Sequence, residues 1–143
     1  MKKFAFRLEP LLKIRSEKTA EAKDMLGQAM QVRIAKERTI AEKKQYSLEL
    51  QKKGVHETKI SVQELAANFH HLRAVAEEIK QLEKEHAQVL EIESLRRGIL
   101  SEAMKQEKVL DKLKEKKKEQ FLKDVAHEEN ALLEDIAQRR VSR

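Results

Sequence analysis

The sequence predicts an all-α protein: a long antiparallel two-helix coiled-coil hairpin with an extended C-terminal helix. Apolar residues recur at helical spacing through most of the second half of the chain, and one short segment carries a helix stop followed by a helix start. Ala, Glu, Lys, Leu and Arg make up more than half of the 143 residues, a composition typical of coiled coils. Aromatic residues are only 3% of the chain and glycine occurs three times, which leaves little material for a compact core.

The apolar stripe of the second half is one or two residues wide and is flanked by charge. It advances in steps of three or four residues, as the seam of a coiled coil does. Its members are Val62, Leu65, Phe69, Leu72, Val75, Ile79, Leu82, His86, Val89, Ile92, Arg96, Ile99, Ala103, Gln106, Leu110 and Leu113. Such a helix needs a partner to cover its apolar stripe, so we expect its function to be binding to another helix or protein and not catalysis.

A first helix is expected over residues 10–53. Pro10 suits a first helical turn, which has no use for its missing N–H. Helical spacing then holds for a looser apolar set, which weakens before Ile40 and Leu48. This set is Leu11, Ile14, Ala22, Met25, Ala29 and Val32.

A loop is expected over residues 54–61. Gly54 can take the left-handed conformation that ends a helix. Ser61 and Glu64 form the Ser-x-x-Glu capping box that starts one. The second helix is therefore predicted over residues 62–139.

A short loop makes the two helices antiparallel neighbours, so the whole chain, residues 1–143, is expected to form a single hairpin domain. A fold centre near residue 57 brings Leu11 opposite Met104. Everything beyond Gln106 would then overhang the first helix.

The absence of cysteine excludes a disulfide framework, a thiolate nucleophile and a cysteine metal site. Uncharged stretches such as residues 65–72 are far shorter than the roughly 20 apolar residues that span a bilayer. The opening residues 1–7 lack the apolar core of a signal peptide. We therefore expect a soluble, cytoplasmic protein.

No set of residues predicts catalysis. The histidines lack the spacing of a zinc site, and no glycine-rich phosphate loop occurs. We expect no enzyme activity, no cofactor and no metal, so any ATP hydrolysis would belong to another subunit. The histidines are His56, His70, His71, His86 and His127.

The segment 105–123 holds eight lysines and four acidic residues in a chain of net charge +6. A solvated helix surface of mixed charge is one interpretation. Docking onto an acidic protein surface is a second. Nucleic-acid binding is the weakest, because the stacking aromatic residues that would support it are missing.

An apolar surplus is predicted near the loop. Phe69, Leu72, Val75 and Ile79 would face residues 36–46, which contain few apolar side chains. These four residues belong to the seam by default. The imbalance also suggests that some apolar surface near the loop is available to another protein.

Three segments resemble the FliJ family, the small coiled-coil proteins of the bacterial flagellar export apparatus. They are FAFRLEPLLKIR at residues 4–15, SVQEL at residues 61–65 and NALLEDIA at residues 130–137, which is followed by arginines. The resemblance covers nearly the whole chain, and its opening motif is the most specific part.

The resemblance implies a non-enzymatic component of flagellar type III export, similar to the central stalk subunit of rotary ATPases, with a role in flagellum biogenesis, motility and chemotaxis. Its implied partners are the hexameric export ATPase, the cytoplasmic domain of the export gate and export chaperones. Association with the inner membrane at the flagellar base would be peripheral and through these partners, with no nucleic acid involved.

The resemblance also implies the contact residues. Gate contacts are expected in the early second helix, where His71 stands in place of the family's aromatic residue. ATPase contacts are expected at the termini, where apolar side chains of the predicted overhang would otherwise stay wet. The gate set is Phe69, His71, Leu72, Val75 and Ile79, and the ATPase set is Phe4, Phe6, Leu8, Leu110, Leu113, Phe121, Val125 and Leu132.

Two alternatives stay open. One is the equivalent stalk protein of a virulence-type III secretion system. The other is a basic coiled-coil scaffold that binds polyanions through residues 112–118, whose affinity would fall steeply with salt.

Overall fold

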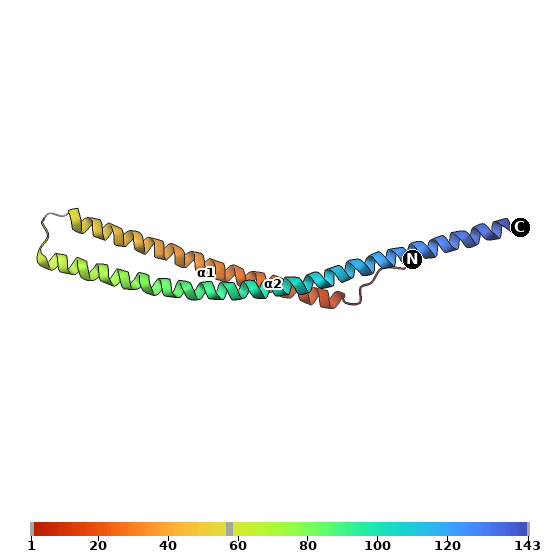
Figure 1. The fold of residues 1–143 in the computed structure, drawn as a ribbon, viewed down its shortest axis with the longest axis horizontal. Coiled ribbons are helices and arrows are strands. Elements are labelled where there is room, and N and C mark those ends of the chain that lie inside the picture. The colour runs from red at the N-terminus through yellow and green to blue at the C-terminus, as the bar shows by residue number, and fades with distance from the viewer. Residues whose placement is uncertain (1, 57–58, 143) are drawn as a thin grey trace. The chain divides into compact units, whose positions relative to one another are not determined.

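The computed structural model describes residues 2–56 and 59–142, which contain two long helices and no strand (Figure 1). The first helix, α1, spans Glu9–His56, and the second, α2, spans Val62–Val141. The helices pack against each other as a helical hairpin, which confirms the predicted all-α fold class. Contacts divide the chain into a terminal unit, Met1–Glu21 with Ser101–Arg143, and a loop unit, Ala22–Leu100.

The start of α2 has the predicted cap. The Ser61 hydroxyl accepts a hydrogen bond from the Glu64 N–H at 3.2 Å, and the Leu65 N–H donates to the Ser61 carbonyl at 3.0 Å. The first bond satisfies a donor that a helix start leaves without an intrahelical partner, and the second is the first backbone bond of the helix. Ser61 is therefore the N-cap of α2.

The end of α1 differs from the prediction. Gly54 lies inside the helix without a positive φ, and α1 continues to His56. The predicted helix stop at Gly54 is therefore wrong, because this glycine keeps ordinary helical geometry. The rest of the expected loop includes residues 57 and 58, which lie outside the described residues.

In the loop unit, the inward-facing positions of both helices advance in strictly alternating steps of three and four, which is heptad spacing. The positions on α1 are Ala22, Leu26, Ala29, Arg33, Lys36, Ile40, Lys43, Ser47 and Leu50. Those on α2 are Leu72, Val75, Ile79, Leu82, His86, Val89, Glu93, Arg96 and Leu100. Charged and polar side chains thus hold several places that an ordinary seam gives to apolar ones.

The predicted stripe on α2 is correct from Leu72 to Val89 and again at Arg96, but its first members Val62, Leu65 and Phe69 are exposed, and it is wrong by one residue at Ile92 and Ile99. Glu93 is only 5% exposed, whereas the predicted seam residue Ile92 is 45% exposed and Ile99 is 62% exposed. Leu100 takes the inward place expected of Ile99. The prediction followed apolar residues, but an unbroken heptad repeat passes through Glu93, which has an ionic partner on α1.

The same one-residue error occurs on α1. The predicted residues Met25 and Val32 are about half exposed, and their neighbours Leu26 and Arg33 face α2 instead. Ala29 is buried as predicted. Small and charged residues therefore line this part of the seam.

In the terminal unit, residues 2–8 precede α1 and lie along α2. The ring of Phe4 stacks at a tilt on that of Phe121, with centroids 5.7 Å apart, and the Lys2 ammonium pairs with Glu128 at 2.9 Å. Farther along, Arg15 donates a hydrogen bond to Gln106. The predicted start of the overhang at Gln106 is therefore wrong, since this non-helical segment covers α2 as far as Glu128 and the uncovered part begins after it.

The predicted helix register is wrong for a related reason. It placed Lys43 opposite Leu72, but the Lys43 ammonium pairs with Glu78 at 2.6 Å. Because α1 runs past Gly54, the fold centre lies closer to the start of α2 than residue 57. Every position on α1 consequently meets a later residue of α2 than predicted.

Candidate protein-docking surfaces

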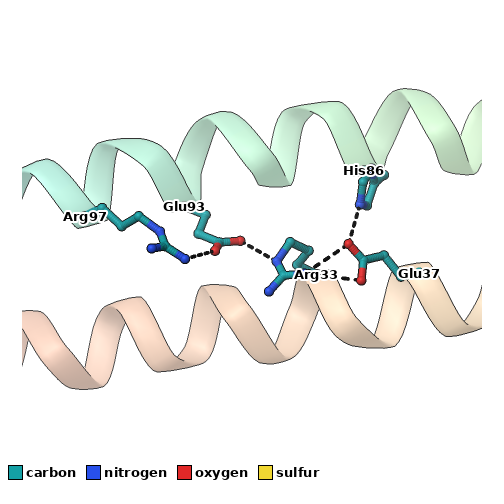
Figure 2. Close-up of polar contacts among 5 residues, drawn as sticks. All are labelled: Arg33, Glu37, His86, Glu93 and Arg97. Atoms are coloured by element: carbon teal, nitrogen blue, oxygen red, sulfur yellow. Dashed lines mark hydrogen bonds and ion pairs between the residues drawn. The ribbon is translucent and has the colours of Figure 1, made fainter.

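Charged side chains cross the seam of the loop unit as one connected network (Figure 2). The Arg33 Nε donates to Glu93 Oε2 at 2.7 Å, and an Arg97 Nη donates to the other oxygen of Glu93 at 2.8 Å. The Arg33 Nη1 donates to Glu37 Oε1 at 3.0 Å, and the same oxygen lies 3.1 Å from His86 Nε2.

The network lowers the pKa values of its two carboxyl groups, Glu37 and Glu93. Hydrogen bonds from Arg97 and then Arg33 hold the pKa of Glu93 below its ordinary value, although burial opposes the shift. Those from His86 and then Arg33 lower the pKa of Glu37. Because a slip by one heptad would leave Glu93 buried without Arg33, we infer that the network fixes the register more than it adds stability.

Three further ion pairs join the helices toward the loop. Lys36 pairs with Glu85 at 2.7 Å, Lys43 with Glu78 at 2.6 Å and Lys44 with Glu83 at 2.9 Å. Hydrogen bonds from Lys43 and Lys36 lower the pKa of Glu78 and Glu85, respectively. The stretch 36–46, which the sequence showed to be poor in apolar residues, therefore contacts α2 chiefly through charge.

The expected gate residues fall into two groups. Val75 is only 3% exposed, and Leu72 and Ile79 are half-buried neighbours in the same seam. Phe69 is 66% exposed, and His71 is also exposed. Of these five residues, only Phe69 and His71 are therefore exposed to a partner.

Tyr46 contacts His71 from α1, although the sequence gave no reason to select it. Its hydroxyl lies 2.9 Å from His71 Nε2, and the two rings meet edge to face with centroids 5.7 Å apart. Tyr46 and His71 each directly precede an inward-facing residue, Ser47 and Leu72. Correct heptad assignment of both helices is the signal that would have paired them.

Five of the eight expected ATPase residues line one groove of the terminal unit. Residues 3–8 and α2 enclose a groove of about 590 Å³ with an apolar floor and a basic rim. Its lining is Lys3, Phe4, Ala5, Phe6, Arg7, Leu8, Leu113, Lys117 and Phe121. Leu110, Val125 and Leu132 lie outside this lining; the first two are half-buried on the same helix, and Leu132 is 62% exposed.

The basic segment 105–123 is partly neutralised within the terminal unit. Lys114 pairs with Glu9 at 2.8 Å, and Lys123 pairs with Glu119 at 2.7 Å. The second pair lowers the pKa of Glu119 and raises that of Lys123. Lys117 lies instead at the rim of the groove, where its charge can serve a partner.

Within residues 2–56 and 59–142, no three histidine, aspartate or glutamate side chains gather to hold a metal ion. In the same part of the chain, neither helix has a stretch apolar and long enough for a membrane span.

The family model described as Flagellar FliJ protein matches residues 3–143, which include both units. The chain belongs to the FliJ family. This membership supports a component of the flagellar export apparatus. No curated protein and no solved structure matches the chain.

Proposed function

We propose that this FliJ-family chain is the stalk-like coiled coil that links the export ATPase ring to the export gate. It would work in the cytoplasm and be held peripherally at the inner membrane of the flagellar base through its partners. The family match favours the flagellar apparatus over a virulence-type secretion system. The two candidate surfaces belong to different units, as a linker with two partners requires.

The groove of the terminal unit is the observation that carries the proposal. Its apolar floor includes Phe6 and Phe121, and its rim has the positive charges of Lys3, Arg7 and Lys117. Aromatic anchors within a charged rim are typical of energetically important interface residues. This groove suits an acidic loop with an apolar tip, and we assign it to the ATPase.

The exposed C-terminal part of α2 extends the ATPase surface. Described side chains from Glu129 to Ser142 are all exposed, and they include Leu132 and Ile136. Burial of solvent-exposed apolar residues by a partner stabilises a helix that has no other element packed against it. We propose that this segment contacts the ATPase together with the groove.

Phe69 and His71, supported by Tyr46, are the proposed gate contacts in the loop unit. Their exposure and their aromatic character suit an interface anchor. Leu72, Val75 and Ile79 would act on gate binding indirectly, by holding α2 against α1. Handling of export chaperones is a further part of the proposed role, without a surface assigned to it.

Binding of purified export ATPase and of the gate cytoplasmic domain tests the two assignments. Phe6→Ala should weaken ATPase binding about tenfold or more and leave gate binding unchanged, because it removes an anchor from the groove. Deleting residues 124–143 should also weaken ATPase binding with gate binding retained. Phe69→Ala with His71→Ala should do the reverse.

Leu133→Ala changes an exposed apolar residue that lies outside the groove lining. Weaker ATPase binding in this variant would therefore be due to the C-terminal segment and not to the groove. Full ATPase affinity in Phe6→Ala at ordinary salt and full helicity would disprove the groove assignment. A polyanion scaffold would instead bind heparin with a log-linear salt dependence, and changing Lys112 and Lys116 would reduce its slope.

A further inference from the structure

One flank of the loop unit is apolar and exposed where its seam is charged. We call it the uncharged flank, and its residues are Met25, Val32, Ile92, Leu95 and Ile99. All five are between 45% and 69% exposed. In a chain in which 39% of residues are charged, five such side chains at helical spacing form an unusual surface.

Contacts elsewhere in the unit show that these residues share one side of the helix pair. Tyr46 and His71 each directly precede a seam residue, and they touch each other. Lys44 and Glu83 each directly follow one, and they pair with each other at 2.9 Å. Residues that precede seam positions on the two antiparallel helices therefore face the same side, and residues that follow them face the other.

Met25, Val32, Ile92 and Ile99 all directly precede seam residues. Leu95 lies between the last two, one turn from each on the outer surface of α2. Met25 and Val32 are seven residues apart on α1, as Ile92 and Ile99 are on α2. The flank thus has two apolar rows, one on each helix.

Two hydrogen bonds show that the rows lie alongside each other. Arg96 donates to the Met25 carbonyl at 2.6 Å, which brings the turn of Ile99 next to Met25. Arg33 donates to Glu93 at 2.7 Å, which brings Val32 and Ile92 together.

The opposite flank of the same section is different. Glu37 and Arg97 follow seam residues there, and both belong to the charged network. Ile34 and Leu90 are exposed outside the uncharged flank, without a matching heptad row. In this section of the loop unit, only the uncharged flank therefore has apolar side chains in heptad rows on both helices.

We propose that the uncharged flank binds one short amphipathic helix of another protein, laid between α1 and α2. Two antiparallel helices with apolar rows at seven-residue spacing provide the holes into which a third helix inserts its side chains. The rows carry no charge, so the occupant needs an apolar stripe at three-four spacing and no excess charge along it.

The size of the flank favours a short helix over a second copy of this chain. Its five side chains expose roughly 500 Å², within the range of functional patches on monomers. A stable dimer buries about 800 Å² on each partner. Each row runs from one heptad position to the next, just over two helical turns, which matches a short partner helix and a reversible complex. This contact is separate from the proposed ATPase and gate surfaces.

A synthetic 18-residue peptide tests the proposal. It would carry leucine at heptad positions a and d, with glutamine, alanine and balanced glutamate and lysine elsewhere. Labelled with fluorescein at nanomolar concentration, it is titrated with the full chain and followed by anisotropy. We expect saturable one-to-one binding that changes less than twofold between 0.1 and 0.5 M NaCl, because no charge pairing drives it.

Two double variants locate the site. Ile92→Gln with Ile99→Gln should weaken peptide binding tenfold or more, and the matched control Ile34→Gln with Leu90→Gln should stay within twofold. Both should keep the helicity and the ATPase and gate affinities of the parent chain.

Three outcomes would overturn the proposal: no saturable binding, equal losses in both variants, or steep salt dependence. A concentration-dependent dimer in sedimentation velocity, removed by Ile92→Gln with Ile99→Gln and not displaced by the peptide, would identify a second copy of the chain as the occupant instead.

Discussion

Replacing Val75 by alanine should destabilise the hairpin, although the sequence places this residue among the gate contacts. Val75 is only 3% exposed, in the seam between α1 and α2. The change removes two buried carbon atoms at about 0.8 kcal/mol each and leaves a small cavity, so we expect a loss of about 2 kcal/mol. Phe69→Ala is the matched control, because a side chain that is 66% exposed should change stability by no more than about 0.5 kcal/mol.

Urea unfolding followed by circular dichroism at 222 nm measures the first effect, and titration with the gate cytoplasmic domain measures the second. Val75→Ala should lower the urea midpoint and keep gate affinity within twofold wherever it remains folded. Phe69→Ala should keep the midpoint and lose gate affinity. An unchanged midpoint in Val75→Ala together with lost gate binding would refute the assignment of this residue to the seam.

Three other changes have defined outcomes. Ser61→Ala removes the N-cap of α2 and should cost about 1 kcal/mol in urea unfolding. The pKa values of Glu37 and Glu93 are lowered from 4.5 in the folded chain, so these carboxylates contribute to folding stability above that pH. The contribution is lost as pH falls through the folded pKa values. The free energy of unfolding should therefore drop below about pH 4.5, and the drop should be smaller in Glu93→Gln. Phe4→Ala should loosen the N-terminal segment and speed tryptic cleavage after Arg7.

Each of these changes has a comparison that isolates its cause. Ser101→Ala alters an exposed serine inside α2 and should leave the urea midpoint in place. If the stability of Glu93→Gln changes with pH as that of the parent does, protonation of Glu93 does not contribute to the loss of stability at low pH. Val141→Ala, at the far end of the terminal unit, should leave cleavage after Arg7 unchanged.

Local chemistry made the helices predictable from the sequence. A three-four apolar repeat and a serine cap depend on neighbouring residues alone, and Ser61 behaves as the pattern indicates. The place where α1 ends was not predictable in this way. Gly54 permits a helix stop without requiring one. Because the predicted end of α1 was wrong, the predicted pairing of residues between the two helices was wrong as well.

The identity of the seam residues depended on contacts between the helices. Ile92 and Glu93 both continue a three-four path, and apolar character alone favours Ile92. Arg33 decides the matter from the other helix, because its guanidinium gives Glu93 a partner inside the seam. Which residues of α2 the segment 2–8 meets was not predictable for a similar reason, since this segment has no periodic pattern to reveal its partner.

Charge inside the seam and apolar side chains outside it have one shared consequence. The Arg33–Glu93 pair fixes the register, but a buried ion pair adds less stability than well-packed apolar residues would. Val32 and Ile92, which could have supplied that packing, remain about half exposed instead. A hairpin built in this way gains stability whenever a partner covers the exposed residues, in proportion to the logarithm of the partner's concentration over its dissociation constant. Binding of the proposed amphipathic helix over Val32 and Ile92 should therefore raise the stability of the hairpin.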